Sequence, residues 1–435
     1  MNNIIEIKPV KGLVGTISIP GDKSVSHRSV MLAGLSETPV TITNFLHAQD
    51  CWSTINCMRA LGVLVEQDNS GVLTVQGKGL HNLSEPDNIL DAGNSGTTLR
   101  LLTGILAAQP FFSVLTGDSS LRRRPMSRVI SPLTIMGCKI IGRSQSRYAP
   151  VAISPAEKVS GIEYDTPVAS AQIKSAIMLA SLFANSPSTI TEPSISRDHT
   201  ERMMATFGIT VTRSGSSVTV QPAQKLAAPQ KLYVPGDISS AAFWLVAASI
   251  IPHSQLTLTN VGINPTRTGI LDVLVRMGAD IAVINEHRSG EEPVADIHVR
   301  SSQLKGVEIE PEIIPRLIDE IPILAVAALF AEGKTVVRGA EELRVKESDR
   351  LAAITTELSK MGANIQETPD GFSIVGPQRI TMASCDSHHD HRMAMAAAIA
   401  GAAGNGVKIS NAECVSISYP SFFKIIDEIS VNPLS

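Results

Sequence analysis

Positively charged side chains recur beside predicted helix starts in this sequence. In the segment GDKSVSHR at 21–28, Lys23 stands at the entrance of a predicted helix, and Arg28 follows Ser24 by four residues on the same helical face. The free N–H groups and the positive dipole end of a helix favour anions. We therefore predict an anion site here, against the simpler interpretation of a helix cap with a solvated basic face.

The same region partly matches a nucleotide-binding loop, GTISIPGDKS at 15–24. In such loops a glycine precedes the lysine, because the backbone must approach the phosphates closely. Here Asp22 precedes Lys23. The sequence therefore disfavours a nucleotide site.

Further cations lie in four short segments: LRRRPMSR at 121–128, SRDHTER at 196–202, RVKESDR at 344–350 and SHHDHRMAM at 387–395. Each alone also fits a surface basic run, a helix cap or a self-neutralised helix; in the third, Lys346 and Arg350 are four apart and are expected to share one helical face. Together they carry more positive charge than one small ligand needs, which predicts two anionic ligands. The cations concerned are Lys23, Arg28, Arg124, Arg197, Lys346, Arg350 and Arg392.

Neutral and acidic groups accompany these cations. In NSGTTLR at 94–100, Asn94 and Gly96 let a ligand approach the backbone, although such residues are also ordinary in turns. In SAQIK at 170–174, Ser170 and Gln172 suit sugar hydroxyls and Lys174 adds charge. In LIDEIPIL at 317–324 a carboxylate pair enters an apolar helix, where desolvation can raise a pKa and prepare a general base.

Three histidines in SHHDHRMAM suggest a metal site as an alternative. The segment lacks the usual spaced ligand set, and Arg392 beside it would repel a cation. His391 and Arg392 at a helix start suit a phosphate or a carboxylate better. We therefore predict no metal and no cofactor.

The composition excludes several kinds of partner. The chain has 435 residues, more than one core of about 250–300 residues accommodates, and 43% of them are hydrophobic. A net charge of −4 offers no global positive field to nucleic acid or a membrane surface. The five cysteines form no CxxC pair, and no leader or long apolar run is visible. We expect a cytoplasmic monomer that binds small molecules.

An internal repeat organises the chain. Phrases such as MRALGVLV at 58–65 and RMGADIAV at 276–283 end a helix and begin a strand, and Ala-rich amphipathic runs precede most of the alternating strands. The pattern predicts six units, each of a helix, a strand, a helix and two strands. Most residues of these units are expected to serve packing alone. The sixth unit lacks its two closing strands, whereas the chain opens with a strand pair that no unit precedes. We therefore expect an N-terminal domain of residues 21–235, and a C-terminal domain of residues 1–20 and 236–435.

With these motifs in order, the sequence resembles the 5-enolpyruvylshikimate-3-phosphate synthase family along essentially its whole length. The motifs are GDKS, NSGT, RRPM, SAQ, RVKESDR and DHRMAM, and SAQIK, RDHTE and NPTR resemble the class II branch. The resemblance implies an α/β fold, a two-domain inside-out α/β barrel (the enolpyruvyl transferase fold) of six βαβαββ repeats, three per domain. It also implies an active site in the interdomain cleft, with shikimate 3-phosphate bound mainly by the N-terminal domain.

The resemblance also implies site residues, carried over position by position. Those for shikimate 3-phosphate are Lys23, Ser24, Arg28, Ser170, Gln172, Arg197, Asp319 and Lys346. Those for phosphoenolpyruvate are Lys23, Asn94, Gly96, Arg124, Gln172, Arg350, His391 and Arg392. Asp319 is the expected base toward the acceptor hydroxyl, and Glu347, with Lys23, the expected group for proton transfer at C3.

Two positions depart from class I members of the family. Ile417 stands before Ser418-Tyr-Pro where those enzymes have a lysine, and Ala171 stands where they have a serine. Two rival functions are a UDP-N-acetylglucosamine enolpyruvyl transferase and a non-catalytic module that binds anionic metabolites. The first carries a reactive cysteine where this chain has RRRPM at 122–126, and the second has no use for Asp319 and Glu347 beside anionic ligands.

Overall fold

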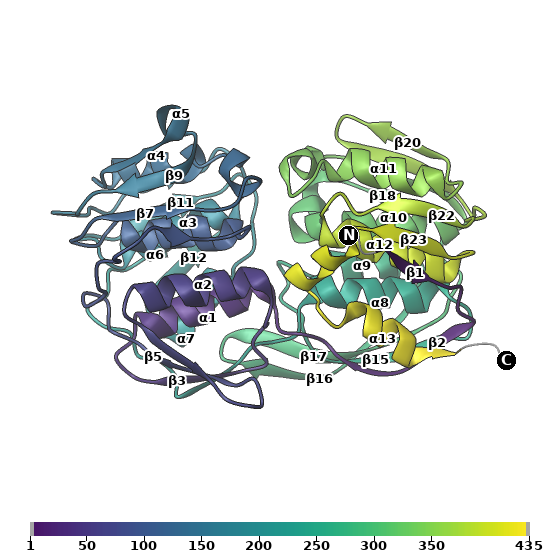
Figure 1. Cartoon of the computed structure of the whole chain (residues 1–435), viewed down its shortest axis with the longest axis horizontal. Helices are drawn as coiled ribbons and strands as arrows, with labels where there is room; N and C mark the ends of the chain where they lie inside the picture. Colours follow the sequence, from purple (N-terminus) through teal and green to yellow (C-terminus); the bar gives the residue numbers. More distant parts are fainter. Residues whose placement is uncertain (1–3, 432–435) are drawn as a thin grey trace. The chain divides into compact units, whose positions relative to one another are not determined.

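The computed structural model describes residues 4–431 and divides into two compact units (Figure 1). Unit 1 comprises the described residues up to Pro20, with Gly236–His287 and the described residues from Pro293 to Val431. Unit 2 comprises Gly21–Pro235 and the short stretch Arg288–Glu292. Each unit has its own hydrophobic core, as expected for a chain of this length.

Unit 2 contains three sheets of one design. In each, a first strand runs parallel to its neighbour, and two antiparallel pairings follow. In spatial order the sheets are β14 (Lys231–Tyr233), β3 (Val40–Thr43), β5 (Leu73–Gln76), β4 (Leu64–Gln67); β6 (Leu90–Asp91), β7 (Ser113–Thr116), β9 (Tyr148–Ile153), β8 (Ile140–Gly142); and β10 (Glu163–Asp165), β11 (Ser188–Thr191), β13 (Ser217–Val220), β12 (Val211–Ser214).

The described part of unit 1 repeats this design with changes at its ends. Its first sheet gains a fifth strand, and its last sheet has three. In spatial order the sheets are β16 (Asp280–Ser289), β17 (Glu292–Arg300), β15 (Gln255–Gly262), β2 (Gly12–Ser18), β24 (Ser430–Val431); β18 (Glu308–Ile309), β19 (Gly333–Val337), β21 (Gly371–Gly376), β20 (Ile365–Thr368); and β1 (Ile5–Ile7), β23 (Val407–Ser410), β22 (Ala383–Asp386).

Two kinds of helix accompany the sheets. Some are buried almost all round and pack on one another, as expected of helices inside a core. These are α1 (Lys23–Gly34), α3 (Gly96–Leu106) and α6 (Ala171–Ser181) in unit 2, and α8 (Ile238–Ile250), α10 (Ile321–Phe330) and α12 (His391–Ala403) in unit 1. The others bury one face: α2 (Gln49–Ala60), α4 (Ser127–Ile135), α7 (His199–Thr206), α9 (Gly269–Arg276), α11 (Arg350–Lys360) and α13 (Phe422–Ile429). One short helix, α5 (Arg143–Ser146), has no buried residue.

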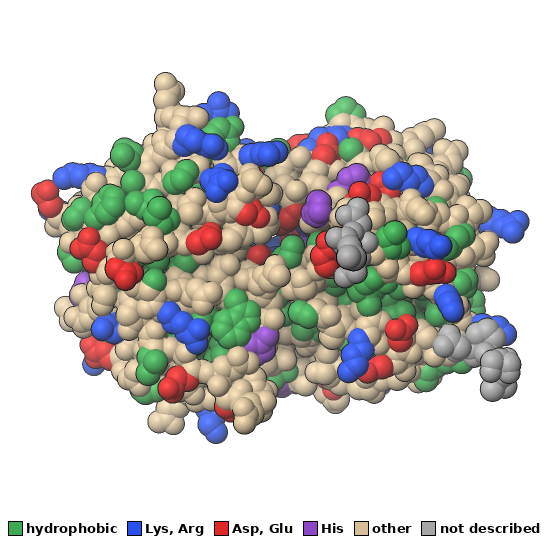
Figure 2. All heavy atoms as spheres, in the orientation of Figure 1, with side chains coloured by type: hydrophobic (Ala, Val, Ile, Leu, Met, Phe, Trp, Pro, Cys, Tyr) green, Lys and Arg blue, Asp and Glu red, His purple; other side chains and the backbone are tan. Residues whose placement is uncertain are grey.

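Helices inside and sheets outside give each unit the predicted inside-out α/β fold. Close contact between the inner helices explains one small residue: a Cβ at Gly104 of α3 would lie 2.3 Å from the carbonyl oxygen of Ala176 in α6. Acidic and basic side chains are interspersed over the face shown in Figure 2. Among residues 4–431, no helix combines the length and apolarity that a bilayer crossing requires.

The first strands of the chain behave differently from the expected strand pair. β1 pairs antiparallel with β23 and completes the last sheet, whereas β2 pairs parallel with β15 in another sheet. The prediction that they form one pair was wrong, because alternation identifies a strand but not its partner. The residues Arg288–Glu292, which form the tip where β16 ends and β17 begins, also lie with unit 2 although they fall within 236–435.

Candidate active site

The start of α1 presents Lys23 and Ser24 directly after Asp22. Asp22 caps the helix, its Oδ1 accepting the N–H of Val25 at 2.9 Å. Lys23 is the first helical residue, half-buried, and its Nζ lies 3.2 Å from Oδ2 of Asp50 in α2. Gly21 is required before this cap, because a Cβ there would lie 2.0 Å from a carbonyl oxygen of the loop after β3.

Arg28 lies one turn further along α1 and is buried. It donates to neutral oxygens: Nε to Thr200 Oγ1 at 2.6 Å, Nη2 to Ser175 Oγ at 2.9 Å and Nη1 to the carbonyl of Ser24 at 2.9 Å. Burial, together with the nearby cation of Arg197, lowers the pKa of Arg28 from its ordinary value to about 10. A cation held in this way favours an incoming anion.

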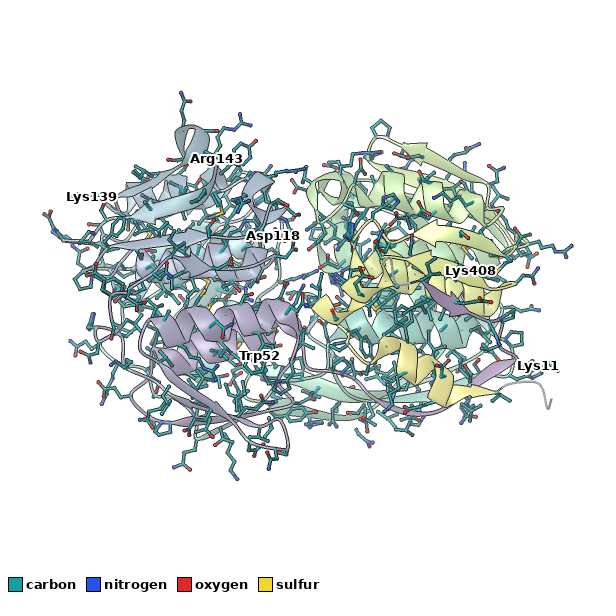
Figure 3. All side chains as sticks on the ribbon, viewed as in Figure 1. Lys11, Trp52, Asp118, Lys139, Arg143 and Lys408 are labelled. Atoms are coloured by element: carbon teal, nitrogen blue, oxygen red, sulfur yellow. The ribbon has the colours of Figure 1, made fainter. Side chains whose placement is uncertain are left out.

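The start of α3 brings Gly96 together with two arginines. Arg124 donates from Nη2 to Oδ1 of Asn94 at 2.9 Å, and Asn94 donates in turn to Asp118, labelled in Figure 3, at 2.7 Å. A Cβ at Gly96 would lie 3.1 Å from Nη1 of Arg100 and 3.4 Å from Nη1 of Arg124. The absence of a side chain at 96 therefore leaves room beside two guanidinium groups.

The start of α6 faces this arginine pair. Gln172 accepts a hydrogen bond from Nη1 of Arg100 and donates to Thr97 Oγ1 at 3.2 Å. Ser170 is half-buried and directly precedes the helix. Lys174, in contrast, is fully buried and ion-paired with Glu192 and Glu201, so the expectation that it adds charge for a ligand was wrong.

In unit 1, Arg350 is the centre of an acidic cluster. It is buried at the start of α11 and pairs with Asp390 at 2.8 Å, Glu347 at 2.8 Å and Asp319 at 3.1 Å. Burial opposes its charge, but these carboxylates outweigh burial and raise the pKa of Arg350 above its ordinary value. Both expected acid–base groups therefore contact one guanidinium.

The start of α12 lies against the same cluster. Arg392 donates from Nη1 to the carbonyl of Asp319 at 3.0 Å, and its Nη2 lies 3.6 Å from the Asp319 carboxylate. Its Nε is buried and makes no hydrogen bond within residues 4–431, a costly state that a bound acceptor would relieve. His391, the first residue of α12, is also buried.

Lys346 lies before α11 rather than in it. Asp349 caps this helix, its Oδ1 accepting the N–H of Ala352 at 3.1 Å, so Lys346 and Arg350 do not share a helical face. The prediction of a shared helical face was wrong because the cap residue Asp349 makes Arg350 the first residue of the helix. Lys346 is half-buried.

Sequence reasoning missed two residues of these clusters. Arg100 stands in the quoted segment NSGTTLR, and its position four residues after Gly96 on a helix would have placed it on the same face. Asp390 stands in the DHR motif, where an acidic residue before an apolar helix signals a cap; here it both caps α12 and pairs with Arg350.

The segment after Ile417 is structural. Tyr419 is fully buried, and its hydroxyl accepts a hydrogen bond from Nε1 of Trp244 at 2.9 Å. Phe422 packs on both rings, with centroids 5.0 Å from Trp244 and 5.6 Å from Tyr419. This aromatic group anchors the C-terminal residues to α8.

Two inside-out α/β units, with Lys23 and Arg392 in the first turns of the buried helices α1 and α12, place the chain in the class of two-domain inside-out α/β enzymes. The chain belongs to one family of this class: the sequence model of EPSP synthase (3-phosphoshikimate 1-carboxyvinyltransferase) matches residues 7–426. The predicted family and fold class are thus confirmed.

Similar proteins extend over the whole chain. The sequence is 56% identical over 426 residues to the 3-phosphoshikimate 1-carboxyvinyltransferase of Desulforudis audaxviator (strain MP104C), covering 98% of this chain and 99% of that protein. It is 51% identical to the protein of the same name from Brevibacillus brevis (strain 47 / JCM 6285 / NBRC 100599), covering 98% and 100%. The solved structure of EPSP synthase from Acinetobacter baumannii is 42% identical, with a TM-score of 0.90, and covers 99% of both chains.

Proposed function

We propose that the chain transfers the enolpyruvyl (carboxyvinyl) group of phosphoenolpyruvate to the 5-hydroxyl of shikimate 3-phosphate. The products are 5-enolpyruvylshikimate 3-phosphate and phosphate, on the shikimate pathway to chorismate and the aromatic amino acids. The observation that carries this conclusion is the family match over residues 7–426, with relatives of that name matched end to end. The rival acting on UDP-N-acetylglucosamine is not favoured by these relatives.

The assignment of residues to the two substrates is part of this proposal. For shikimate 3-phosphate they are Lys23, Ser24, Arg28, Ser170, Gln172, Arg197, Asp319 and Lys346. For phosphoenolpyruvate they are Lys23, Asn94, Gly96, Arg124, Gln172, Arg350, His391 and Arg392. Two observations support bound anions. Burial disfavours the charged guanidinium of Arg28, which an anion would stabilise, and the buried Nε of Arg392 makes no hydrogen bond within residues 4–431.

The reaction needs one base and one acid that exchange roles. The 5-hydroxyl oxygen bonds to C2 of phosphoenolpyruvate as its proton leaves to Asp319, while C3 gains a proton. The C2–O bond to phosphate then breaks, a C3 proton is removed and the double bond returns. Glu347, with Lys23, is proposed for the proton at C3, and the arginines stabilise charge on the departing phosphate.

The contacts of Arg350 support these roles. Asp319 and Glu347 both bind its guanidinium, so their negative charge is stabilised and their oxygens are held in place. A phosphate or carboxylate that binds Arg350 would compete with them. Ligand binding at Arg350 would therefore change the contacts of both proposed acid–base groups.

A phosphate-release assay tests the proposed function. Phosphate should appear only when phosphoenolpyruvate and shikimate 3-phosphate are both present, and the organic product should carry the enolpyruvyl group. Release with UDP-N-acetylglucosamine instead would favour the rival transferase. Binding of both substrates without phosphate release would favour the non-catalytic module.

The proposal includes a cytoplasmic monomer that acts on small molecules and not on nucleic acid. Support comes from the net charge of −4 and from the five cysteines, which are all free and buried, as suits a reducing compartment. Sedimentation at micromolar concentration should give a mass near 46.2 kDa. A species of twice that mass would contradict the monomer.

A further inference from the structure

The segment at 196–201 leads into α7 and carries Arg197. In this run Arg197 is half-exposed, whereas the other five residues are buried. Asp198 occupies the N-cap position of α7, and its Oδ1 accepts a hydrogen bond from Nε of Arg202 at 2.9 Å. The segment is therefore shaped by inward contacts that leave one cation toward the surface of unit 2.

A buried charge group holds the first end of this segment. Nζ of Lys174 lies 2.7 Å from Oε2 of Glu192 and 2.8 Å from Oε1 of Glu201. Glu192 in turn accepts both the N–H of Ser196, at 3.3 Å, and its hydroxyl. Because the lysine is fully buried, removing either glutamate would unbalance a buried charge group, so these contacts hold Ser196 and Glu201 in place.

A residue from a distant part of the sequence holds the helix start. Nδ1 of His199 lies 2.7 Å from Oε1 of Glu292, and both side chains are buried. Glu292 belongs to the tip between β16 and β17, which lies with unit 2. The tip is also fixed by the carbonyl of Glu291, which accepts from Arg202 at 2.9 Å, and by the hydroxyl of Ser289, which donates to the carbonyl of Tyr233 at 2.7 Å.

The first turn of α7 also sets the position of Arg28. Thr200 lies between His199 and Glu201 in sequence, and its hydroxyl accepts from Nε of Arg28 at 2.6 Å and bonds Ser175 at 2.6 Å. A shift of this turn would therefore move both Arg28 and Arg197. The Glu292 carboxylate also favours the charged form of Arg28 against the effect of burial.

We propose that Glu292 is a positioning residue for the acceptor phosphate: through His199 it fixes the first turn of α7, which orients Arg28 and Arg197. This inference rests on the proposed function, because the two arginines are assigned there to shikimate 3-phosphate. It assigns a role to the β16–β17 tip, which carries no motif of the family resemblance.

Titration calorimetry of the full chain with shikimate 3-phosphate, without phosphoenolpyruvate, tests the inference. Glu292→Ala should raise the Kd about tenfold, and Glu292→Gln about threefold, because the amide keeps a hydrogen bond to the imidazole but loses the charge. The matched control is Glu291→Ala, whose exposed carboxylate pairs with Arg288 in the same tip. Its Kd, and the KM for phosphoenolpyruvate in all three variants, should stay within about twofold of wild type.

Two results separate positioning from a merely structural role. A lower Tm with an unchanged Kd per folded molecule in Glu292→Ala would overturn the inference. Should that variant fail to fold, Glu292→Gln carries the test, and a Kd equal to wild type would overturn it. If the wild-type chain turns over both substrates and Glu292→Ala binds shikimate 3-phosphate normally, this inference alone is wrong. If the wild-type chain does not bind shikimate 3-phosphate, the proposed function is wrong as well.

Discussion

Arg28, one turn into α1 of unit 2, and Arg350, at the start of α11 in unit 1, are both buried, yet their surroundings are opposite. Arg28 donates to two hydroxyls and a carbonyl, and burial lowers its pKa. Arg350 contacts three carboxylates, which raise its pKa despite burial. Within residues 4–431, no carboxylate binds the first guanidinium directly, whereas three bind the second.

Under the proposed function, the difference distinguishes binding of the acceptor phosphate from proton transfer. A cation held by neutral oxygens gains most from an arriving phosphate, so unit 2 is suited to hold the acceptor. A cation surrounded by carboxylates fixes groups that can exchange protons, so unit 1 is suited to the chemistry. The following variants should change one property and leave the other.

The largest expected effect is on turnover, from Asp319→Asn. Loss of a positioned base costs about 10²–10⁴ in rate, so kcat should fall by that factor while the Kd for shikimate 3-phosphate changes little. Steady-state phosphate release and calorimetry measure the two quantities. Asp427→Asn, on the exposed face of α13, is the control. Full turnover in Asp319→Asn would break the comparison.

The next effect is on stability, from Arg350→Met compared with Arg28→Met. Removal of Arg350 leaves carboxylates uncompensated, with Asp390 fully buried, and should lower the free energy of unfolding by about 3–5 kcal/mol. Removal of Arg28 leaves Thr200 and Ser175 bonded to each other at 2.6 Å, so its cost should be about 1 kcal/mol. Urea unfolding measures both. Equal losses would contradict the difference between the two surroundings.

A smaller effect is on binding, from Arg28→Met. Charge-assisted hydrogen bonds of about 1.5–3 kcal/mol should be lost, which raises the Kd for shikimate 3-phosphate by about tenfold to a hundredfold. At saturating substrate, kcat should stay within a few-fold of wild type. Arg28→Lys should recover only part of the affinity, because an ammonium cannot reproduce the fork. A fall in kcat with unchanged Kd would reverse the assignment.

The smallest effect is the acid stability of unit 1. Burial would raise the pKa of Asp390, but Arg350 outweighs it and holds that pKa below 3.8. The stabilisation is therefore complete above the unfolded value and is lost as the pH falls through the folded one, from about pH 4 downward. Each unit contains one tryptophan, so Trp52→Phe leaves Trp244 to report on unit 1. The unfolding free energy of unit 1 should fall less steeply with decreasing pH when Asp390→Asn is added. An identical slope would exclude Asp390 as a source of the acid sensitivity.

Much of the fold follows from local patterns. Runs such as the Ala-rich segment at 236–251 predict helices, and their apolar faces continue all round, which places them in a core. Strand partners could not be predicted, because alternation is the same for β1 and β2 although their sheets differ. Motif spacing identified the helix starts and hence the cations there.

What escaped prediction concerns partners distant in sequence. Lys174 and Arg28 are both cations on helices, and only the tertiary neighbours Glu192 and Glu201 make the first a structural ion pair. Glu292 and His199 are 93 positions apart, with no local pattern to connect them. Lys346 was misplaced because a single cap residue, Asp349, decides where α11 begins.

The strand pairings also set an order of assembly during synthesis. All three sheets of unit 2 are built from strands between residues 40 and 233, so their last strand, β14, emerges from the ribosome long before translation ends. β1 and β2 are made first, yet their partners include β23 and β24 near the end of the chain. β1 must therefore wait for β23, and one edge of β2 for β24, until the chain has been made as far as residue 431.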